Sequence, residues 1–185
     1  LVSDANANRQ NLGDITKGNL YAGAELAVRI LPRTSKAGYS KFAIWHTDGT
    51  STGEPLNAQL GPSGWGFFIK LEQEMTADGR GVLIGRYGKS YKGSALYGQQ
   101  AGLHWVLNNP YFFGRISNDA LGLAINWVQP NVSETRDEYN IEVFYRLPIL
   151  PRMDITPNYM FLINPSLNLV VDYASAFGLR IRTTF

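Results

Sequence analysis

The sequence predicts an all-β protein, a transmembrane antiparallel up-and-down β-barrel of the bacterial outer membrane, and three observations lead to this prediction. Nine segments alternate apolar and polar residues with a period of two, and each is close to the roughly 9–11 residues that cross a bilayer as a tilted strand. The mean hydropathy of −0.16 is too polar for a helical membrane protein, and no run of about 18 apolar residues occurs. The last strand has one apolar and one cationic face and ends in Phe185, as closing strands of outer-membrane barrels commonly do.

The N-terminal part is expected to contain a tail and three strands. Residues 1–18 are polar and rich in Asn, Asp and Gly, and we expect an extracellular loop or tail ahead of barrel strands in residues 19–185. The first three strands are predicted at Leu20–Ile30, Tyr39–Thr47 and Trp65–Met75. Their apolar faces carry Leu26, Val28, Phe42, Ile44, Phe67, Ile69 and Leu71, and their opposite faces carry Glu25, Lys41, Lys70 and Glu72.

The next three strands are predicted at Gly81–Lys89, Gln99–Leu107 and Ala120–Val128. An Asp-Gly pair at Asp78 marks a tight turn before the first of them. The apolar faces carry Leu83, Tyr87, Leu103, Trp105, Leu123, Ile125 and Trp127, and the opposite faces carry Arg86, His104 and Asn126.

The last three strands are predicted at Glu138–Leu147, Asp154–Asn164 and Asp172–Phe185, and the segment between the first two of these is expected to be a compact turn. Alternation is clearest here. The apolar faces carry Tyr139, Ile141, Val143, Tyr159, Phe161, Phe177, Leu179 and Ile181, and the opposite faces carry Glu142, Arg146, Asn158, Arg180 and Arg182.

Connections between the strands tend to alternate between short and long, as periplasmic turns and external loops do, and Tyr and Trp recur near strand ends, as interfacial girdles require. Bacterial single-chain barrels have an even number of strands with both ends at the periplasm. Counted back from Phe185, about nine strands place Leu1 outside the cell. We therefore expect this chain to be the C-terminal part of a larger barrel.

The last fifty residues carry a more specific pattern. It consists of Glu142, Tyr145 and Arg146, then I-T-P-N at 155–158 with I-N-P at 163–165, and a closing G-L-R-x-R-x-x-F at 178–185. This pattern resembles the C-terminal end of the OprB-type carbohydrate-selective porins, and weaker likeness extends upstream to Asn19. The resemblance implies a barrel of about sixteen strands through which glucose-like sugars diffuse passively across the Gram-negative outer membrane. Here the usual glycine-rich stretch after I-N-P reads SLNL, and the N-terminal half of the family's barrel has no counterpart.

The polar faces would line a hydrated lumen that suits a neutral sugar, because both signs of charge and several amides are present. The mid-strand members should lie nearest the membrane centre. The candidate pore-lining, substrate-binding residues are Glu25, Lys70, Glu72, Arg86, His104, Asn126, Glu142, Asn158 and Arg180. The expected partners are permeating sugars, outer-membrane lipid and lipopolysaccharide, the N-terminal half of the barrel in the same or a separate chain, and further copies in a homo-oligomer.

Other function classes have little support in the sequence. The two histidines, His46 and His104, lie in separate segments without metal-ligand spacing, no G-x-S-x-G motif occurs and Cys is absent, so we expect no catalytic residues, metal or cofactor. The net charge of +2 does not indicate a nucleic-acid partner. Two alternatives remain: a small self-closed outer-membrane barrel acting as an enzyme or structural anchor, and a soluble carbohydrate-binding β-sandwich.

Overall fold

The structure, a computed structural model, describes residues 2–4, 20–30, 38–47, 63–92, 97–112, 118–131, 135–166 and 168–184. Its strands are β1 (Val2–Asp4), β2 (Leu20–Ile30), β3 (Gly38–Thr47), β4 (Gly64–Glu74), β5 (Gly81–Lys92), β6 (Tyr97–Asn108), β7 (Ala120–Pro130), β8 (Glu138–Leu150), β9 (Met153–Ile163) and β10 (Tyr173–Thr183). Within these ranges no helix has the length and apolar character needed to span a membrane.

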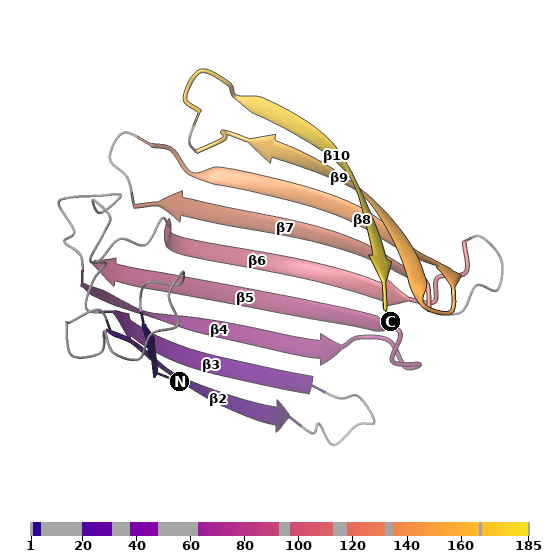
Figure 1. The fold of residues 1–185 in the computed structure, drawn as a ribbon, viewed down its shortest axis with the longest axis horizontal. Coiled ribbons are helices and arrows are strands. Elements are labelled where there is room, and N and C mark those ends of the chain that lie inside the picture. Colours follow the sequence, from indigo (N-terminus) through magenta and orange to yellow (C-terminus); the bar gives the residue numbers. More distant parts are fainter. Residues whose placement is uncertain are drawn as a thin grey trace.

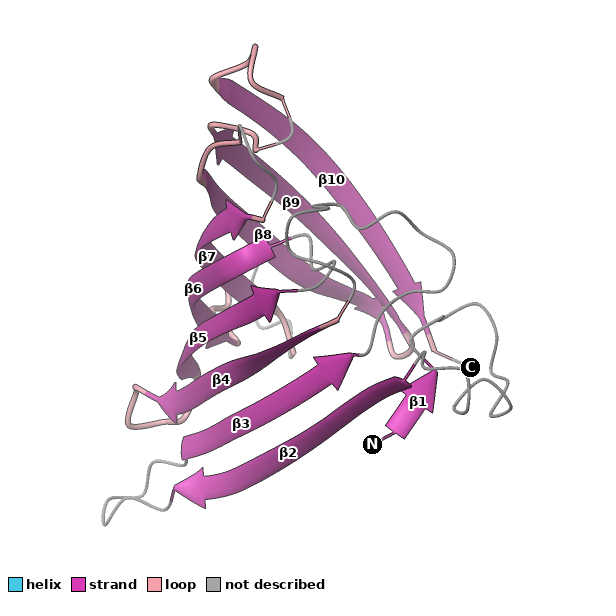
Figure 2. Cartoon of the chain, turned by 90° about the vertical axis from the view of Figure 1, so that its left-hand side faces the viewer, coloured by secondary structure: helices cyan, strands magenta, loops and turns pink. Residues whose placement is uncertain are grey.

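The strands form one sheet in which each pairs antiparallel with the next along the chain, from β1 to β10 (Figure 1). Figure 2 shows that this sheet curves to one side as an open trough. Among the described residues β10 pairs only with β9, so the sheet is not closed. A single curved sheet is not a β-sandwich, which needs two sheets packed face to face.

The all-β, antiparallel up-and-down arrangement is confirmed, and all nine predicted strands are present. Two boundaries differ from the prediction. Val2–Asp4, in the segment expected to be a loop or tail, forms the short β1 against β2, while residues 5–19 lie outside the described part. β8 continues to Leu150, so the compact turn is only 151–152; Pro148 is tolerated in it because the register shifts between Pro148 and Leu150.

One face of the sheet is apolar and exposed. The predicted outward residues fall opposite one another in every strand pair; for example, Leu26 pairs with Phe42, and Leu103 pairs with Ile125. Leu26 is 64% exposed and Phe177 is 74% exposed. The only hydrophobic residues buried in the described chain are alanines on the other face, so the apolar surface is directed outward rather than into a core. Such a surface is stable in lipid, not in water.

The polar face is the concave one. In the first half of β8, residues 138–144, side chains of the polar face are half-buried whereas those of the apolar face are exposed: Glu142 is half-buried between the exposed Ile141 and Val143. Side chains converge and shield one another on the inside of a curved sheet and diverge on its outside. The polar side chains therefore line the trough.

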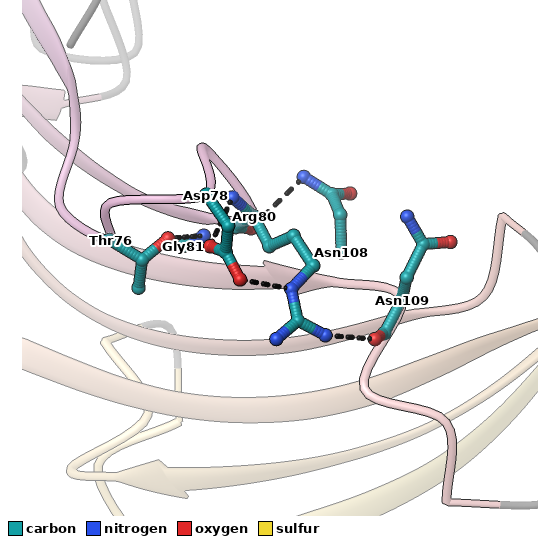
Figure 3. Close-up of polar contacts among 6 residues, drawn as sticks. All are labelled: Thr76, Asp78, Arg80, Gly81, Asn108 and Asn109. Atoms are coloured by element: carbon teal, nitrogen blue, oxygen red, sulfur yellow. Dashed lines mark hydrogen bonds and ion pairs between the residues drawn. The ribbon is translucent and has the colours of Figure 1, made fainter. Parts of the chain in front are cut away.

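The turn between β4 and β5 is bonded to the next hairpin (Figure 3). Asp78 accepts hydrogen bonds from Arg80 N at 3.1 Å and from Arg80 Nε at 2.5 Å, and Gly79 supplies the φ of +71° that this turn needs. Hydrogen bonds from Thr76 and Arg80 hold the pKa of the Asp78 carboxyl well below its usual range. Arg80 Nη1 also donates to the Asn109 carbonyl at 2.9 Å, which ties this turn to the segment after β6.

At the opposite end, side chains before and at the start of β8 hold the loop between β9 and β10. Arg136 Nη1 pairs with Asp172 Oδ1 at 2.7 Å, and Nη2 donates to the Val171 carbonyl. Glu138 Oε2 accepts hydrogen bonds from Ser166 N at 2.9 Å and Ser166 Oγ at 3.1 Å. Ser166 is 1% exposed, so this loop is anchored by a buried contact.

Candidate functional site

Strand register places all nine predicted site residues on the polar, concave face. Lys70 lies opposite Arg86 in the register. His104 on β6 and Glu142 on β8 both lie opposite Ala124 on β7, the strand between them. The period-two alternation alone determines this placement, because each strand's apolar residues are fixed on the other face.

Six of the nine line a single groove of about 320 Å³ that crosses β5 to β10. We call it the polar groove, and its lining residues are Arg86, His104, Ala124, Asn126, Glu142, Phe144, Arg146, Asp154, Thr156, Asn158, Arg180 and Arg182. The polar groove brings together residues that are nearly one hundred positions apart in the chain. They become neighbours because β5 to β10 form one continuous sheet.

The first cluster in the polar groove centres on Asn126. Its Oδ1 accepts hydrogen bonds from Arg86 Nη2 at 2.9 Å and from His104 Nε2 at 2.8 Å. Because an amide oxygen only accepts, His104 carries its proton on Nε2. Gly102 lies between Arg86 and Asn126 in the register, and a Cβ there would come within 2.6 Å of Asn126 Oδ1. The missing side chain is what allows Arg86 to reach across β6.

The second cluster joins β8 and β9. Asn158 Nδ2 donates to Glu142 Oε1 at 2.9 Å, and Asn158 faces Gly178 on β10, whose lack of a side chain again leaves room for the amide. Arg180 lies two residues further along β10, and in the described part of the chain its guanidinium makes no hydrogen bond or ion pair.

Charge in the polar groove is unbalanced toward positive. It contains four arginines and only two carboxylates, those of Glu142 and Asp154. Asp154 pairs with Arg182 at 3.1 Å, and Glu142 is bonded to an amide rather than to a cation. Both signs are present, as predicted, but donors to an oxygen-rich solute outnumber acceptors.

Glu25, Lys70 and Glu72 lie on the same face but outside the polar groove. Glu25 pairs with Lys41 at 2.6 Å, and Lys70 pairs with Glu72 at 2.8 Å. In each of these partly exposed pairs on β2 to β4, the two charged groups bind each other, so fewer charged groups remain to contact a solute.

Several groove residues were not among the nine candidates. Asp154 and Arg182 lie near the ends of their strands, where the rule of choosing mid-strand positions excludes them. The polar groove approaches the short-turn end over β8 to β10, as the row of Pro148, Asp154 and Arg182 shows. The register depends on how neighbouring strands are aligned, and alternation within a single strand does not determine that alignment.

The described residues contain no cluster of three metal-ligating side chains. His104 is engaged by Asn126.

Comparisons with known proteins agree with this geometry. The model of the family described as carbohydrate-selective porin, OprB family, matches residues 4–185. The solved structure titled "High pH structure of Pseudomonas putida OprB" is similar with a TM-score of 0.74 and 16% identity, over 90% of this chain and 49% of that chain. This chain thus spans about half the length of the structure that it matches. No curated protein matches it.

Proposed function

The chain belongs to the OprB family of carbohydrate-selective porins and is an outer-membrane protein, and from this premise we propose that it forms the wall of a hydrated pore for passive diffusion of glucose-like sugars. The observation that carries the proposal is the polar groove, a concave surface of arginine, amide, carboxylate and aromatic groups opposite an exposed apolar face.

A sugar offers hydroxyl groups that both donate and accept hydrogen bonds, and a flat face that stacks on aromatic rings. Arg86, Arg180 and Asn158 supply donors, Glu142 supplies an acceptor, and the ring of Phe144 supplies apolar surface. Several weak contacts of this kind favour entry without trapping the solute, because each one replaces hydrogen bonds to water at little net gain. Diffusion down a gradient needs no cofactor and no bond-making chemistry.

The pore needs more wall than the described sheet supplies. β10 offers a free edge, and unpaired edges in a membrane must be satisfied by another strand. We propose that the remaining strands come from an N-terminal half, in the same polypeptide or a separate chain, with residues 1–18, which include the short strand β1, at the external end of the sheet and with copies assembling as a homo-oligomer. The open sheet gives no support to a small self-closed barrel, so we propose that the protein has no enzymatic activity.

The excess of arginines favours a second, related substrate class, sugars that carry a carboxylate or phosphate. Glucose and gluconate distinguish the two, since they differ in charge and little in size.

The test is sugar-induced block of ion current through the intact protein in planar bilayers. Glucose should lower the current, and Arg180→Ala should weaken the apparent glucose affinity by about 2- to 10-fold, the value of one hydrogen bond. The matched control is Arg152→Ala, in the exposed turn outside the polar groove. Block by gluconate but not glucose would support the charged-sugar alternative, and the absence of block by either would contradict a sugar pore.

A further inference from the structure

The membrane-facing side of the sheet is not uniformly smooth. A hollow of about 600 Å³ lies on β4 to β8. These strands form the middle of the sheet (Figure 1). Its floor is made by Gly85 and Ala101, and its walls include Ile69, Leu71, Ile125 and Trp127. A Cβ added at Gly85 would meet nothing within 4 Å, so the hollow is open space and not a packing contact. We call it the outer furrow.

Polar side chains lie beside the outer furrow, toward the C-terminal ends of β5 and β7. Tyr87 lines the furrow, and its hydroxyl donates to Gln99 Oε1 at 2.7 Å; Gln99 Nε2 donates in turn to Gln129 Oε1 at 2.9 Å. Gln99 pairs across the sheet with Lys89 on one side and Gln129 on the other. These four residues, Tyr87, Lys89, Gln99 and Gln129, form what we call the polar cap.

The polar cap has unused donors. In the described part of the chain Lys89 makes no ion pair, and its Nζ lies 4.8 Å from the centroid of the Tyr91 ring. The amide nitrogen of Gln129 donates to no described group. Tyr91 stacks on Trp65 with centroids 4.2 Å apart, which adds a flat aromatic surface beside the lysine. Asp137, in the segment before β8, is the nearby carboxylate, and its Oδ2 accepts from Trp127 Nε1 at 2.9 Å.

The position of the polar cap fits the outer lipid headgroups. Lys89 is three residues from the end of β5, so it lies within about 10 Å of the strand end at 3.3 Å per residue. Gln129 is one residue from the end of β7. These strand ends lie opposite to the end of the sheet that carries the two-residue turn 151–152 and the C-terminal end of β10. Short turns and chain ends lie at the periplasm in bacterial barrels, so the ends of β5 and β7 face outward. Polar groups here meet headgroups, whereas the outer furrow below them meets acyl chains.

We propose that the outer furrow and the polar cap together bind one phosphorylated glycolipid of the outer leaflet, with an acyl chain in the outer furrow and its phosphorylated sugar on the polar cap. Charge complementarity selects this occupant, because the polar cap holds a lysine, two amides and no carboxylate. A phosphate pairs with Lys89, sugar hydroxyls pair with Gln129, and the Trp65–Tyr91 stack offers a surface for the sugar ring. A second copy of this chain placed by two-fold symmetry on the same patch would bring like lysines together.

The test is native mass spectrometry of the intact protein in detergent, titrated with hexa-acylated diphosphoryl lipid A. We expect a one-to-one adduct that survives removal of bulk detergent. Lys89→Gln should lower the apparent affinity about tenfold because it removes a charge-assisted contact, and Gly85→Leu should lower it at least as much because it fills the outer furrow. Arg152→Gln, at the opposite end, and Ser175→Leu, on the exposed outer face of β10, are the matched controls.

Unchanged binding in both Lys89→Gln and Gly85→Leu would overturn the proposal. Equal retention of zwitterionic phosphatidylethanolamine, which has no net charge and no sugar, would also overturn it. A protein dimer that lipid A does not dissociate would overturn it as well, since the face would then be an interface between copies. Sugar conductance is measured separately, so failure here leaves the pore proposal standing, and failure of sugar block leaves the lipid site standing.

Discussion

Asn158 on β9 donates a hydrogen bond to Glu142 on β8 at 2.9 Å, so that one of the two carboxylates in the polar groove is held by a neutral amide. Among the described residues Glu142 makes no ion pair, so in the proposed pore its negative charge would contribute to the potential of the lumen. Its effect on permeating ions can be measured directly.

Glu142→Gln should make the channel more selective for anions, because it leaves Asp154 as the only carboxylate among four arginines in the polar groove. The measurement is the reversal potential in a potassium chloride gradient. Glu25→Gln is the control, since Glu25 lies outside the polar groove and pairs with Lys41. A larger shift for Glu25→Gln would place the narrow part of the lumen elsewhere.

Gly102→Ala should destabilise the protein by up to about 1 kcal/mol, because its Cβ would lie 2.6 Å from Asn126 Oδ1 and 2.9 Å from Arg86 Nε and would push these side-chain ends out of their hydrogen bond. Gly85→Ala is the control on the opposite face. It meets open space and should leave stability unchanged or raise it by up to about 1 kcal/mol. Urea unfolding of the barrel, followed by its heat-modifiable mobility, measures both; equal midpoints would contradict the account of Gly102.

Acid should loosen the turn between β4 and β5. The pKa of Asp78 is lowered in the folded state by hydrogen bonds from Thr76 and Arg80. Its stabilising effect is therefore complete above its unfolded pKa of about 4 and is lost as the pH falls from there through the lower folded value. The protection factors of the amides in residues 75–80, which correct the exchange rates for the intrinsic slowing of exchange in acid, should fall below about pH 4. In Asp78→Asn this pH dependence should disappear, and its persistence would assign the acid response to another group.

Removing the Arg136 guanidinium should free the loop between β9 and β10. Arg136→Ala loses the pair with Asp172 and the bond to the Val171 carbonyl, so amide exchange across residues 168–172 should rise at least tenfold. Asp78→Asn, at the other end of the sheet, serves as the control. If exchange in the loop were unchanged, the Ser166 contact with Glu138 would be sufficient to hold it.

Alternation within single strands predicted the fold and the direction of each side chain, since a period of two leaves one assignment per strand once one face is apolar. The predicted strand Gly81–Lys89 is short and alternates weakly, yet in β5 Leu83 and Tyr87 lie outward and Arg86 inward, as expected. The predicted end of β8 was wrong. Proline is typical of turns, but here the register shift next to Pro148 accommodates it within the strand.

The groupings on the polar face could not be predicted in the same way. Arg86 reaches Asn126 across an intervening strand only because Gly102 leaves space there, and this depends on the stagger of three strands. Both residues were predicted to line the pore, but nothing in the sequence indicated that they contact each other. Arg182 and Asp154 were not among the nine candidates, which were chosen by their position within a strand. They reach the polar groove because of the stagger between neighbouring strands.

The central claim is that the polar groove lines the conducting path and the apolar face does not. The sequence contains no cysteine, so single cysteines can be introduced without background. Thr156→Cys places a thiol in the polar groove, and Tyr159→Cys places one on the exposed apolar face of the same strand. A water-soluble, positively charged methanethiosulfonate should lower the current through Thr156→Cys, more slowly when glucose is present, and should leave Tyr159→Cys unchanged. Modification that lowers the current only in Tyr159→Cys would contradict the assignment of the two faces and with it the proposed pore.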